Sequence, residues 1–288
     1  MRVIRADEMG MCFGVRDALE AIHQIQDPKE VTIHGELVHN SVVNLELKEA
    51  GFRQSSEENR KIPEDSNQVL ITAHGISDRE RKRLLSANKQ LIDTTCPLVR
   101  RAHAAALELE AEGRFVIVIG TPGHVEVRGI VEDLNDFVVV KSGSEVSAYR
   151  HTRLGVMCQT TMPSETVKQI RNRILELNSD ADIRFIDTVC HPTKKRQAAL
   201  LDLIDQVDAV VVVGGHNSNN TRRLVQQCEA RSRPAFHVAS SEELDPSWFR
   251  EFETVGLTAG TSTLDVTIRA VQKSLEQMQT VKRQAIGG

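Results

Sequence analysis

The sequence predicts an α/β protein of three pseudo-equivalent small units with parallel sheets arranged around a central cavity. One observation is a repeat: Cys12, Cys96 and Cys190 are each followed by a helical apolar pattern and then by an apolar run that ends in glycine, 23, 24 and 24 residues on. The second is that the apolar runs are short and continuous, which is typical of strands in a parallel sheet covered on both faces.

The first α/β unit is expected over residues 13–95 and the second over 96–189. The first contains the apolar runs "VTIHG" and "VLITAHG", and the second contains "FVIVIG" and "LGVMCQTT". Helical patterns with capping residues separate these runs. A further strand in each unit leads through Asp-Thr, at 93–94 and 187–188, to the next cysteine.

The third α/β unit is expected to combine residues 190–280 with 1–12. Its runs are "AVVVVG" and "VGLTAGTS", and the helix after them has no strand beyond it. The run "RVIRAD" at 2–7, by contrast, is a strand with no helix before it. We therefore expect the N-terminal strand to complete the third sheet. Residues 281–288 are expected to form a disordered tail.

Composition narrows the kinds of partner. The formal net charge of −4 and the pI near 6.2 do not favour nucleic acid or an anionic membrane, so small molecules and proteins are the expected partners. No signal-peptide pattern and no run of 18 apolar residues occurs. We expect a cytoplasmic protein.

The five cysteines are too few and too scattered for a disulfide framework, and no Cys-x-x-Cys occurs. Cys12, Cys96 and Cys190 share one position in the repeat. Cys158 and Cys228 do not, and are interpreted as core residues.

Three thiolates at helix starts suit a soft metal centre, because aligned peptide dipoles favour negative charge there. Three cysteine ligands leave one coordination position of the metal centre open. Both a catalytic zinc ion and a cubane iron–sulfur cluster with one iron free for substrate meet that description. The number of ligands alone does not decide between them.

Polar residues gather at the loop and strand ends of the repeat. They are His39, Asn40, His74, His124, Glu126, Gln159, Thr160, Thr161, Ser218, Asn219, Asn220 and Ser262. Such a donor-rich set with one carboxylate can hold a phosphate or diphosphate without lysine. For Ser218 and Ser262, a role as helix N-caps is the alternative.

Two further groups flank the cysteines. Asp93 and Asp187 are interpreted as structural residues that bind nearby backbone N–H groups. Basic residues follow each cysteine by four to six positions, and they are either solvated helix faces or a docking surface for an acidic electron carrier. They are Arg16, Arg100, Arg101, Lys194, Lys195 and Arg196.

Over nearly its whole length the chain resembles the LytB-type family of 4-hydroxy-3-methylbut-2-enyl diphosphate reductases. The resemblance is carried by the stretches "MCFGVRDAL", "GELVHN", "AHGIS", "DTTCPLV", "GHVEVRG", "QTT", "NSNNTRRL" and "TAGTS". It implies a [4Fe-4S] cluster held by Cys12, Cys96 and Cys190, with one iron left for the substrate. It also implies a reductive dehydroxylation in the methylerythritol phosphate route to isoprenoids, with ferredoxin or flavodoxin as electron donor.

The resemblance also implies roles for the polar residues. Glu126 would supply a proton, with Thr160 near the substrate hydroxyl and His124 beside them. The substrate diphosphate would be held by His39, His74, His124, Ser218, Asn220 and Ser262, with Asn219 in the same loop.

The chain departs from the family pattern at four places. Val125 replaces the usual proline, Asn219 stands where serine or glycine is usual, His191 follows the third cysteine in an unusual context, and Leu264 replaces another proline. Two alternatives therefore stay open: a diverged homologue acting on another phosphorylated alcohol, and a non-catalytic iron–sulfur sensor or zinc-stabilised binding protein.

Overall fold

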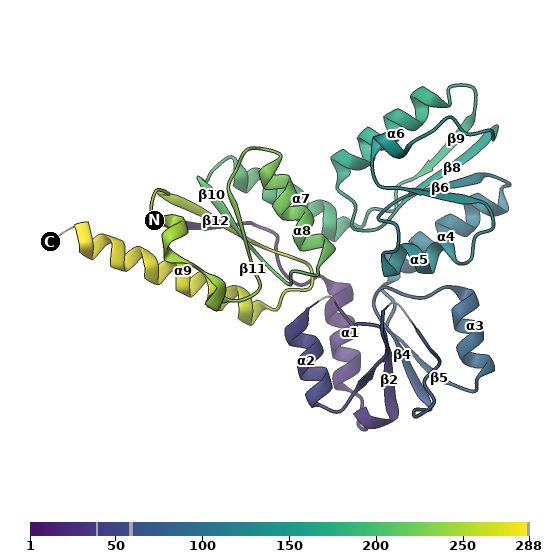
Figure 1. Ribbon diagram of the computed structural model, residues 1–288, viewed down its shortest axis with the longest axis horizontal. Coiled ribbons are helices and arrows are strands. Elements are labelled where there is room, and N and C mark those ends of the chain that lie inside the picture. Colours follow the sequence, from purple (N-terminus) through teal and green to yellow (C-terminus); the bar gives the residue numbers. More distant parts are fainter. Residues whose placement is uncertain (39, 58–59, 287–288) are drawn as a thin grey trace. The chain divides into compact units, whose positions relative to one another are not determined.

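The computed structural model describes residues 1–38, 40–57 and 60–286, and the chain divides into two compact units. The terminal unit, which holds both chain ends, comprises Met1–Val15, His39–Val43 and Lys194–Gly288. The internal unit comprises Arg16–Val38 and Asn44–Thr193. Together they contain three sheets of four parallel strands, which can be followed in Figure 1. The predicted α/β class with three parallel sheets is confirmed.

The terminal unit has the sheet order β1-β12-β10-β11. Its strands are β1 (Arg2–Arg5), β10 (Ala209–Val213), β11 (Ala235–Val238) and β12 (Thr254–Ala259). Its main helices are α7 (His191–Ile204), which starts in the internal unit, α8 (Asn219–Glu229) and α9 (Asp265–Ile286), with 3-10 turns at Ser241–Glu243 and Pro246–Phe249. Because β1 pairs in parallel with β12, the N-terminal strand completes this sheet as predicted.

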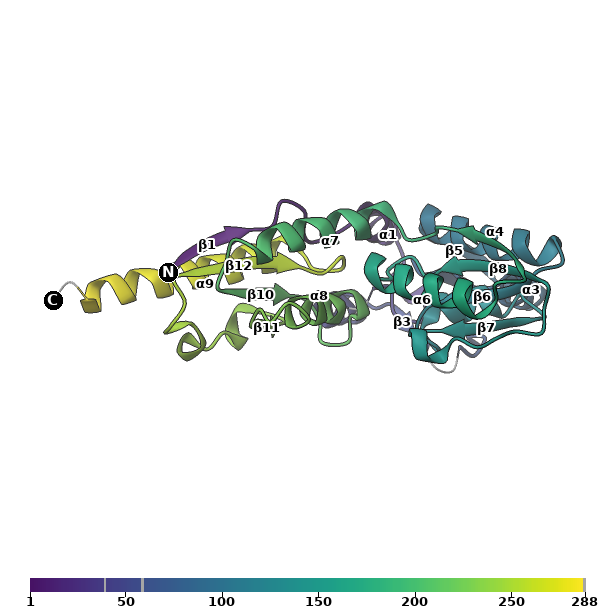
Figure 2. The same ribbon diagram turned by 90° about the horizontal axis from the view of Figure 1, so that it is seen from above.

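Helices cover both faces of this sheet. Val211 and Val213 of β10 pack in one cluster with Ile268 of α9. Val210 and Val212 pack in another cluster, which includes Leu200 of α7 and Leu224 of α8. Both views in Figures 1 and 2 show α9 running along β1, which it contacts. Burial on both faces explains why β10 is apolar throughout, in place of the alternation expected for a half-exposed strand.

The internal unit contains two sheets of matching strand order, β3-β2-β4-β5 and β7-β6-β8-β9. Their strands are β2 (Val31–His34), β3 (Arg53–Gln54), β4 (Gln68–Ile71), β5 (Gln90–Asp93), β6 (Phe115–Ile119), β7 (Phe137–Val140), β8 (Arg153–Cys158) and β9 (Asp182–Ile186). The helices are α1 (Phe13–His23) and α2 (Ser41–Glu49), which both start in the terminal unit, α3 (Asp78–Ser86), α4 (Pro97–Ala111), α5 (Val125–Val131) and α6 (Ser164–Leu177), with 3-10 turns at Pro28–Glu30 and Gly143–Glu145. The strands β5 and β9 therefore flank β4 and β8 as β1 flanks β12.

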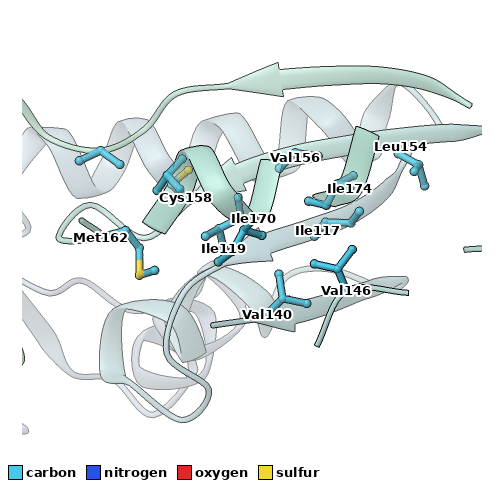
Figure 3. Packing of buried hydrophobic residues seen from close by; sticks show 12 residues of the cluster. Ile117, Ile119, Val140, Val146, Leu154, Val156, Cys158, Met162, Ile170 and Ile174 are labelled. Atoms are coloured by element: carbon cyan, nitrogen blue, oxygen red, sulfur yellow. The ribbon is translucent and has the colours of Figure 1, made fainter. Parts of the chain in front are cut away.

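Figure 3 shows the core on one face of the second of these sheets. Ile117 and Ile119 of β6 pack with Ile170 and Ile174 of α6, and Cys158 of β8 belongs to the same cluster. Cys158 is fully buried, which confirms its interpretation as a core residue.

Hydrogen bonds link the start of α3 to the residues directly after α5. Ser77 Oγ donates to Glu132 (2.8 Å), and Asp133 accepts from the backbone N–H groups of Asp78 and Arg79 (2.6 and 3.0 Å). These bonds connect residues that were predicted to lie in two different α/β units.

Two further observations concern the helices. The helix α9 extends to Ile286, so residues 281–286 are helical, in contrast to the predicted disordered tail. Among the described residues, no helix combines the length and the apolar character needed to cross a bilayer.

Candidate active site

The predicted site residues follow the carboxyl ends of the strands. In the internal unit they are His74 after β4, Cys96 after β5, His124 after β6, Thr160 after β8 and Cys190 after β9. In the terminal unit they are Cys12 after β1, Ser218 after β10 and Ser262 after β12. His39 lies outside the described residues. Parallel sheets collect ligands at this edge.

The three cysteines of the repeat occupy matching turns. Each backbone N–H donates to the carbonyl two residues beyond the end of the neighbouring strand. The three bonds are Cys12 N to Thr261 O (3.2 Å), Cys96 N to Ala73 O (3.1 Å) and Cys190 N to Thr160 O (2.9 Å). A helix begins directly after each cysteine. The predicted equivalence of the three turns therefore holds at the level of backbone contacts.

The cysteines of these three turns differ in exposure from the other two cysteines of the chain. Cys12, Cys96 and Cys190 are partly exposed, whereas Cys158 and Cys228 are buried. Burial raises the pKa of Cys228 to about 12, so this thiol stays protonated near neutral pH.

The thiol set suits a soft metal centre chemically. Cys96 and Cys190 belong to the internal unit, and Cys12 belongs to the terminal unit. Within the described ranges, no group of three or more His, Cys, Asp or Glu side chains is arranged so that it could hold a metal ion. Cys190 Sγ has a polar neighbour that the sequence analysis missed, the buried hydroxyl of Thr193 at 3.0 Å. Its position three residues into the helix is the signal that could have revealed it.

Asp93 and Asp187 hold two of the cysteine turns. Asp93 Oδ1 accepts the N–H of Thr95 (2.9 Å), and Asp187 Oδ1 accepts that of Val189 (3.1 Å). Burial raises the pKa of Asp93, but hydrogen bonds from Thr95 and Arg81 outweigh this effect and leave the pKa below its usual value. These bonds confirm the structural interpretation of both aspartates.

The basic residues after the cysteines have different environments. Arg100 pairs with Asp93 (2.9 Å), and the exposed Lys195 lies 4.0 Å from Glu8. Arg196 is only 6% exposed, and it donates to backbone carbonyls. For Arg196 both interpretations drawn from the sequence are therefore wrong, because a solvated face and a docking surface each require exposure.

Glu126 and Thr160 form a buried pair, 2% and 4% exposed. Glu126 Oε1 accepts the backbone N–H of Thr160 (2.7 Å), and Oε2 accepts its hydroxyl (2.8 Å). His124 is the N-cap of α5, and its Nδ1 accepts the N–H of Glu126 (3.2 Å). In a neutral ring the hydrogen then sits on Nε2. The ring of His74 lies nearly perpendicular to that of His124, with 6.0 Å between centroids.

The loop after β10 presents a second polar group. Ser218 caps α8 by accepting the N–H of Thr221 (3.3 Å), which confirms its capping role. Asn219 Oδ1 accepts from Arg222 (2.6 Å). Asn220 is buried, and its amide Nδ2 has no hydrogen-bond partner in the part of the chain that the structure describes. An unsatisfied buried amide is costly, so this group requires a hydrogen-bond acceptor.

Ser262 lies in the turn between β12 and α9. Its carbonyl accepts from Asn40 Nδ2 (2.8 Å), and Asn40 Oδ1 accepts the N–H groups of Val42 and Val43 (3.0 and 3.3 Å). Because α9 begins at Asp265, Ser262 is not the N-cap of that helix, and this alternative from the sequence is wrong.

A cavity of about 260 Å³ lies elsewhere in the internal unit. It is lined by Tyr149–Thr152 and Leu177–Ala181, at the amino ends of β8 and β9. The site residues follow the opposite ends of these strands, so this cavity is not the candidate active site.

Comparison with known proteins gives consistent likenesses. The LytB protein family matches residues 3–276. The 4-hydroxy-3-methylbut-2-enyl diphosphate reductase of Pelobacter propionicus is 36% identical over 267 residues, which cover 91% of this chain and 93% of that protein. The reductase of the same name from Aquifex aeolicus is 31% identical over 283 residues, which cover 96% of each chain.

Two solved structures are similar. That of (E)-4-hydroxy-3-methyl-but-2-enyl diphosphate reductase, the terminal enzyme of the non-mevalonate pathway, is 32% identical with a TM-score of 0.67, and the match covers 96% of this chain and 100% of that one. The Plasmodium falciparum reductase has a TM-score of 0.85 at 24% identity, covering 96% and 87%, and supports the fold alone.

Proposed function

The chain belongs to the LytB family, and we propose that it is a 4-hydroxy-3-methylbut-2-enyl diphosphate reductase. The reaction takes up two electrons and two protons, releases the substrate hydroxyl as water, and leaves isopentenyl and dimethylallyl diphosphates. The observation that supports this best is the buried Glu126–Thr160 pair, a carboxyl group held at the end of a parallel strand where substrates bind.

The proposal includes one [4Fe-4S] cluster per chain, held by Cys12, Cys96 and Cys190, with one iron not ligated by cysteine. When bound, the cluster supplies electrons and a Lewis-acidic iron for the hydroxyl oxygen. In support, these three thiols alone among the five are partly exposed, and each directly precedes a helix. Helix N-termini favour negatively charged ligands such as thiolates.

Glu126 is proposed to protonate the departing oxygen. Thr160 fixes both oxygens of the carboxyl group, one through its N–H and one through its hydroxyl. A held acid needs no reorientation during proton transfer, and general acids of this kind contribute roughly 10²–10⁴-fold to a rate.

The diphosphate is proposed to bind neutral donors. They are His39, His74, His124, Ser218, Asn219, Asn220 and Ser262. Two observations support this assignment: Nε2 of neutral His124 carries the hydrogen, and the buried amide of Asn220 needs an acceptor, which a phosphate oxygen would provide.

Anaerobic purification, analysis of iron and sulfide, and an assay with reduced dye and the hydroxymethylbutenyl diphosphate test the proposal together. We expect about four irons per chain and consumption of the substrate. Zinc in place of iron would reject the cluster. An intact cluster that does not consume this substrate would instead favour a homologue acting on another phosphorylated alcohol.

An acidic electron carrier such as ferredoxin or flavodoxin is the proposed donor, and a cytoplasmic location is part of the same proposal. The exposed Lys195 and its neighbour Lys194 are the proposed docking residues. Charge reversal at both should slow turnover with the protein donor and leave turnover with a small dye unchanged. Equal rates with both donors would remove these lysines from the interface.

A further inference from the structure

The Cys12 turn lacks the carboxylate that holds the other two turns. Three residues before the cysteine, the other turns have Asp93 and Asp187, whereas this turn has Met9. A methionine side chain cannot accept a backbone N–H as a carboxylate does. Another group must therefore fix the backbone here.

Arg196 contacts this turn from α7. Its Nε donates to the carbonyl of Gly10 (3.0 Å), and its Nη2 donates to the carbonyl of Met11 (3.2 Å). Those are the two residues directly before Cys12. Burial of a guanidinium is costly unless its hydrogen bonds are made, so the carbonyls and the arginine constrain each other.

The backbone of the Cys12 turn is also constrained by contacts of Gly10. Gly10 has φ +74°, and a Cβ at this position would lie 2.7 Å from Ile268 Cδ1 of α9. Gly10 N also donates to Ala259 O at the end of β12 (3.2 Å). The backbone before Cys12 is thus fixed by the sheet and α9 on one side and by Arg196 on the other.

We propose that Arg196 is a positioning residue for the Cys12 thiol, with the role for this turn that Asp93 and Asp187 have for theirs. The bonding is reversed, because an aspartate accepts a backbone N–H and the arginine donates to backbone carbonyls. The inference rests on the proposed function, in which Cys12 is a cluster ligand. Loss of groups that orient metal ligands commonly weakens metal binding 10- to 100-fold.

The first test is loss of iron to a chelator from the anaerobically prepared holoprotein. We expect Arg196→Gln to release iron about tenfold faster than the wild type. Arg196→Lys should be intermediate, because an ammonium keeps the charge but not the two-pronged geometry. The matched control is Arg231→Gln, an exposed arginine of the terminal unit that also donates to a backbone carbonyl, Gln227 O at 3.5 Å. Equal rates for Arg196→Gln and the control would overturn the proposal.

The second test needs no cluster. Metal-free protein is treated with iodoacetamide, and alkylation at each cysteine is followed by mass spectrometry. In Arg196→Gln we expect Cys12 to react several-fold faster relative to Cys96, with the buried Cys158 and Cys228 still protected. A similar rise in the alkylation rate at all four of these cysteines would indicate general unfolding and would overturn a specific role of Arg196 at the Cys12 turn.

The two tests separate the inference from the function. If the wild type binds no iron–sulfur cluster, the proposed function fails, and alkylation still decides whether Arg196 orders the Cys12 turn. If Arg196→Gln does not fold, Arg196→Lys is compared with the wild type in both tests, and unchanged behaviour at Cys12 in that variant counts against the proposal.

Discussion

Two glutamates of the internal unit have opposite surroundings. Glu80 on α3 is bonded to His34 (2.8 Å) and to Arg83 (two bonds of 2.7 Å). Glu126 on α5 receives two hydrogen bonds from neutral groups of one residue, the amide and the hydroxyl of Thr160. Glu80 is thus bonded to two basic side chains, whereas the carboxyl group of Glu126 accepts a backbone amide and a neutral hydroxyl.

The pKa of Glu80 shows the consequence of its surroundings. Burial raises this pKa, but the hydrogen bonds from His34 and Arg83 outweigh burial and lower it from 4.5 to about 2. Glu80 is therefore charged at any pH near neutrality and cannot serve as an acid there. The comparison teaches that two glutamates of one unit differ in the charge of their hydrogen-bond partners, and that such partners set the pKa of Glu80.

The largest expected effect is the loss of turnover in Glu126→Gln. The amide keeps the size of the side chain but cannot deliver the proton, so we expect kcat to fall by about 10²–10⁴-fold. The reduced-dye assay measures the rate, and iron and sulfide analysis verifies that the cluster is retained. Glu80→Gln is the matched control and should turn over normally. Normal turnover in Glu126→Gln would remove Glu126 as the proton donor.

The next largest effect is a loss of stability. It is expected for the change at Glu80, whereas the loss of turnover is expected for the change at Glu126. Glu80→Gln replaces the charge-assisted bonds to His34 of β2 and to Arg83 of the same helix with weaker ones, so the free energy of unfolding should fall by about 1.5–3 kcal/mol. Urea unfolding followed by circular dichroism measures it. A Glu80→Gln protein as stable as the wild type would show that its bonds contribute nothing net.

The sequence was sufficient to predict features that depend on local pattern. The short apolar runs, the shared position of three cysteines and the closing of the last sheet by "RVIRAD" each follow from spacing, and β1 pairing with β12 confirms the last of these. Asp93 and Asp187 were interpretable because their bonds reach only two residues along the chain.

Contacts between residues far apart in the sequence were not predictable in the same way. Arg196 and Gly10 are 186 residues apart, and the helical pattern of α7 gives no sign that one basic residue in "KKR" is buried. The bond between Glu80 and His34 likewise joins residues 46 positions apart, and it depends on where α3 lies relative to β2. Spacing in one sequence does not record such pairs.

A smaller effect on turnover is expected for Thr160→Val. This change removes the hydroxyl bond to Glu126 but keeps the backbone N–H bond, so we expect kcat to fall about tenfold, equivalent to ~1.4 kcal/mol. Thr160→Ser keeps a hydroxyl and should retain most of the activity. A loss in Thr160→Ser as large as that in Thr160→Val would show that the methyl group, and not the hydrogen bond, matters.

The smallest effect is a change with pH in the stability difference between the wild type and Glu80→Gln. Because the pKa of Glu80 is about 2 in the folded protein and its ordinary value is 4.5, the unfolded chain binds the proton first as pH falls. The stabilisation by Glu80 is therefore complete above pH 4.5, declines below it and is lost as pH falls through about 2. Urea midpoints of both proteins at pH 7, 5, 4 and 3 measure this decline. A difference that stays constant down to pH 3 would show that Glu80 is not held in its charged form by His34 and Arg83.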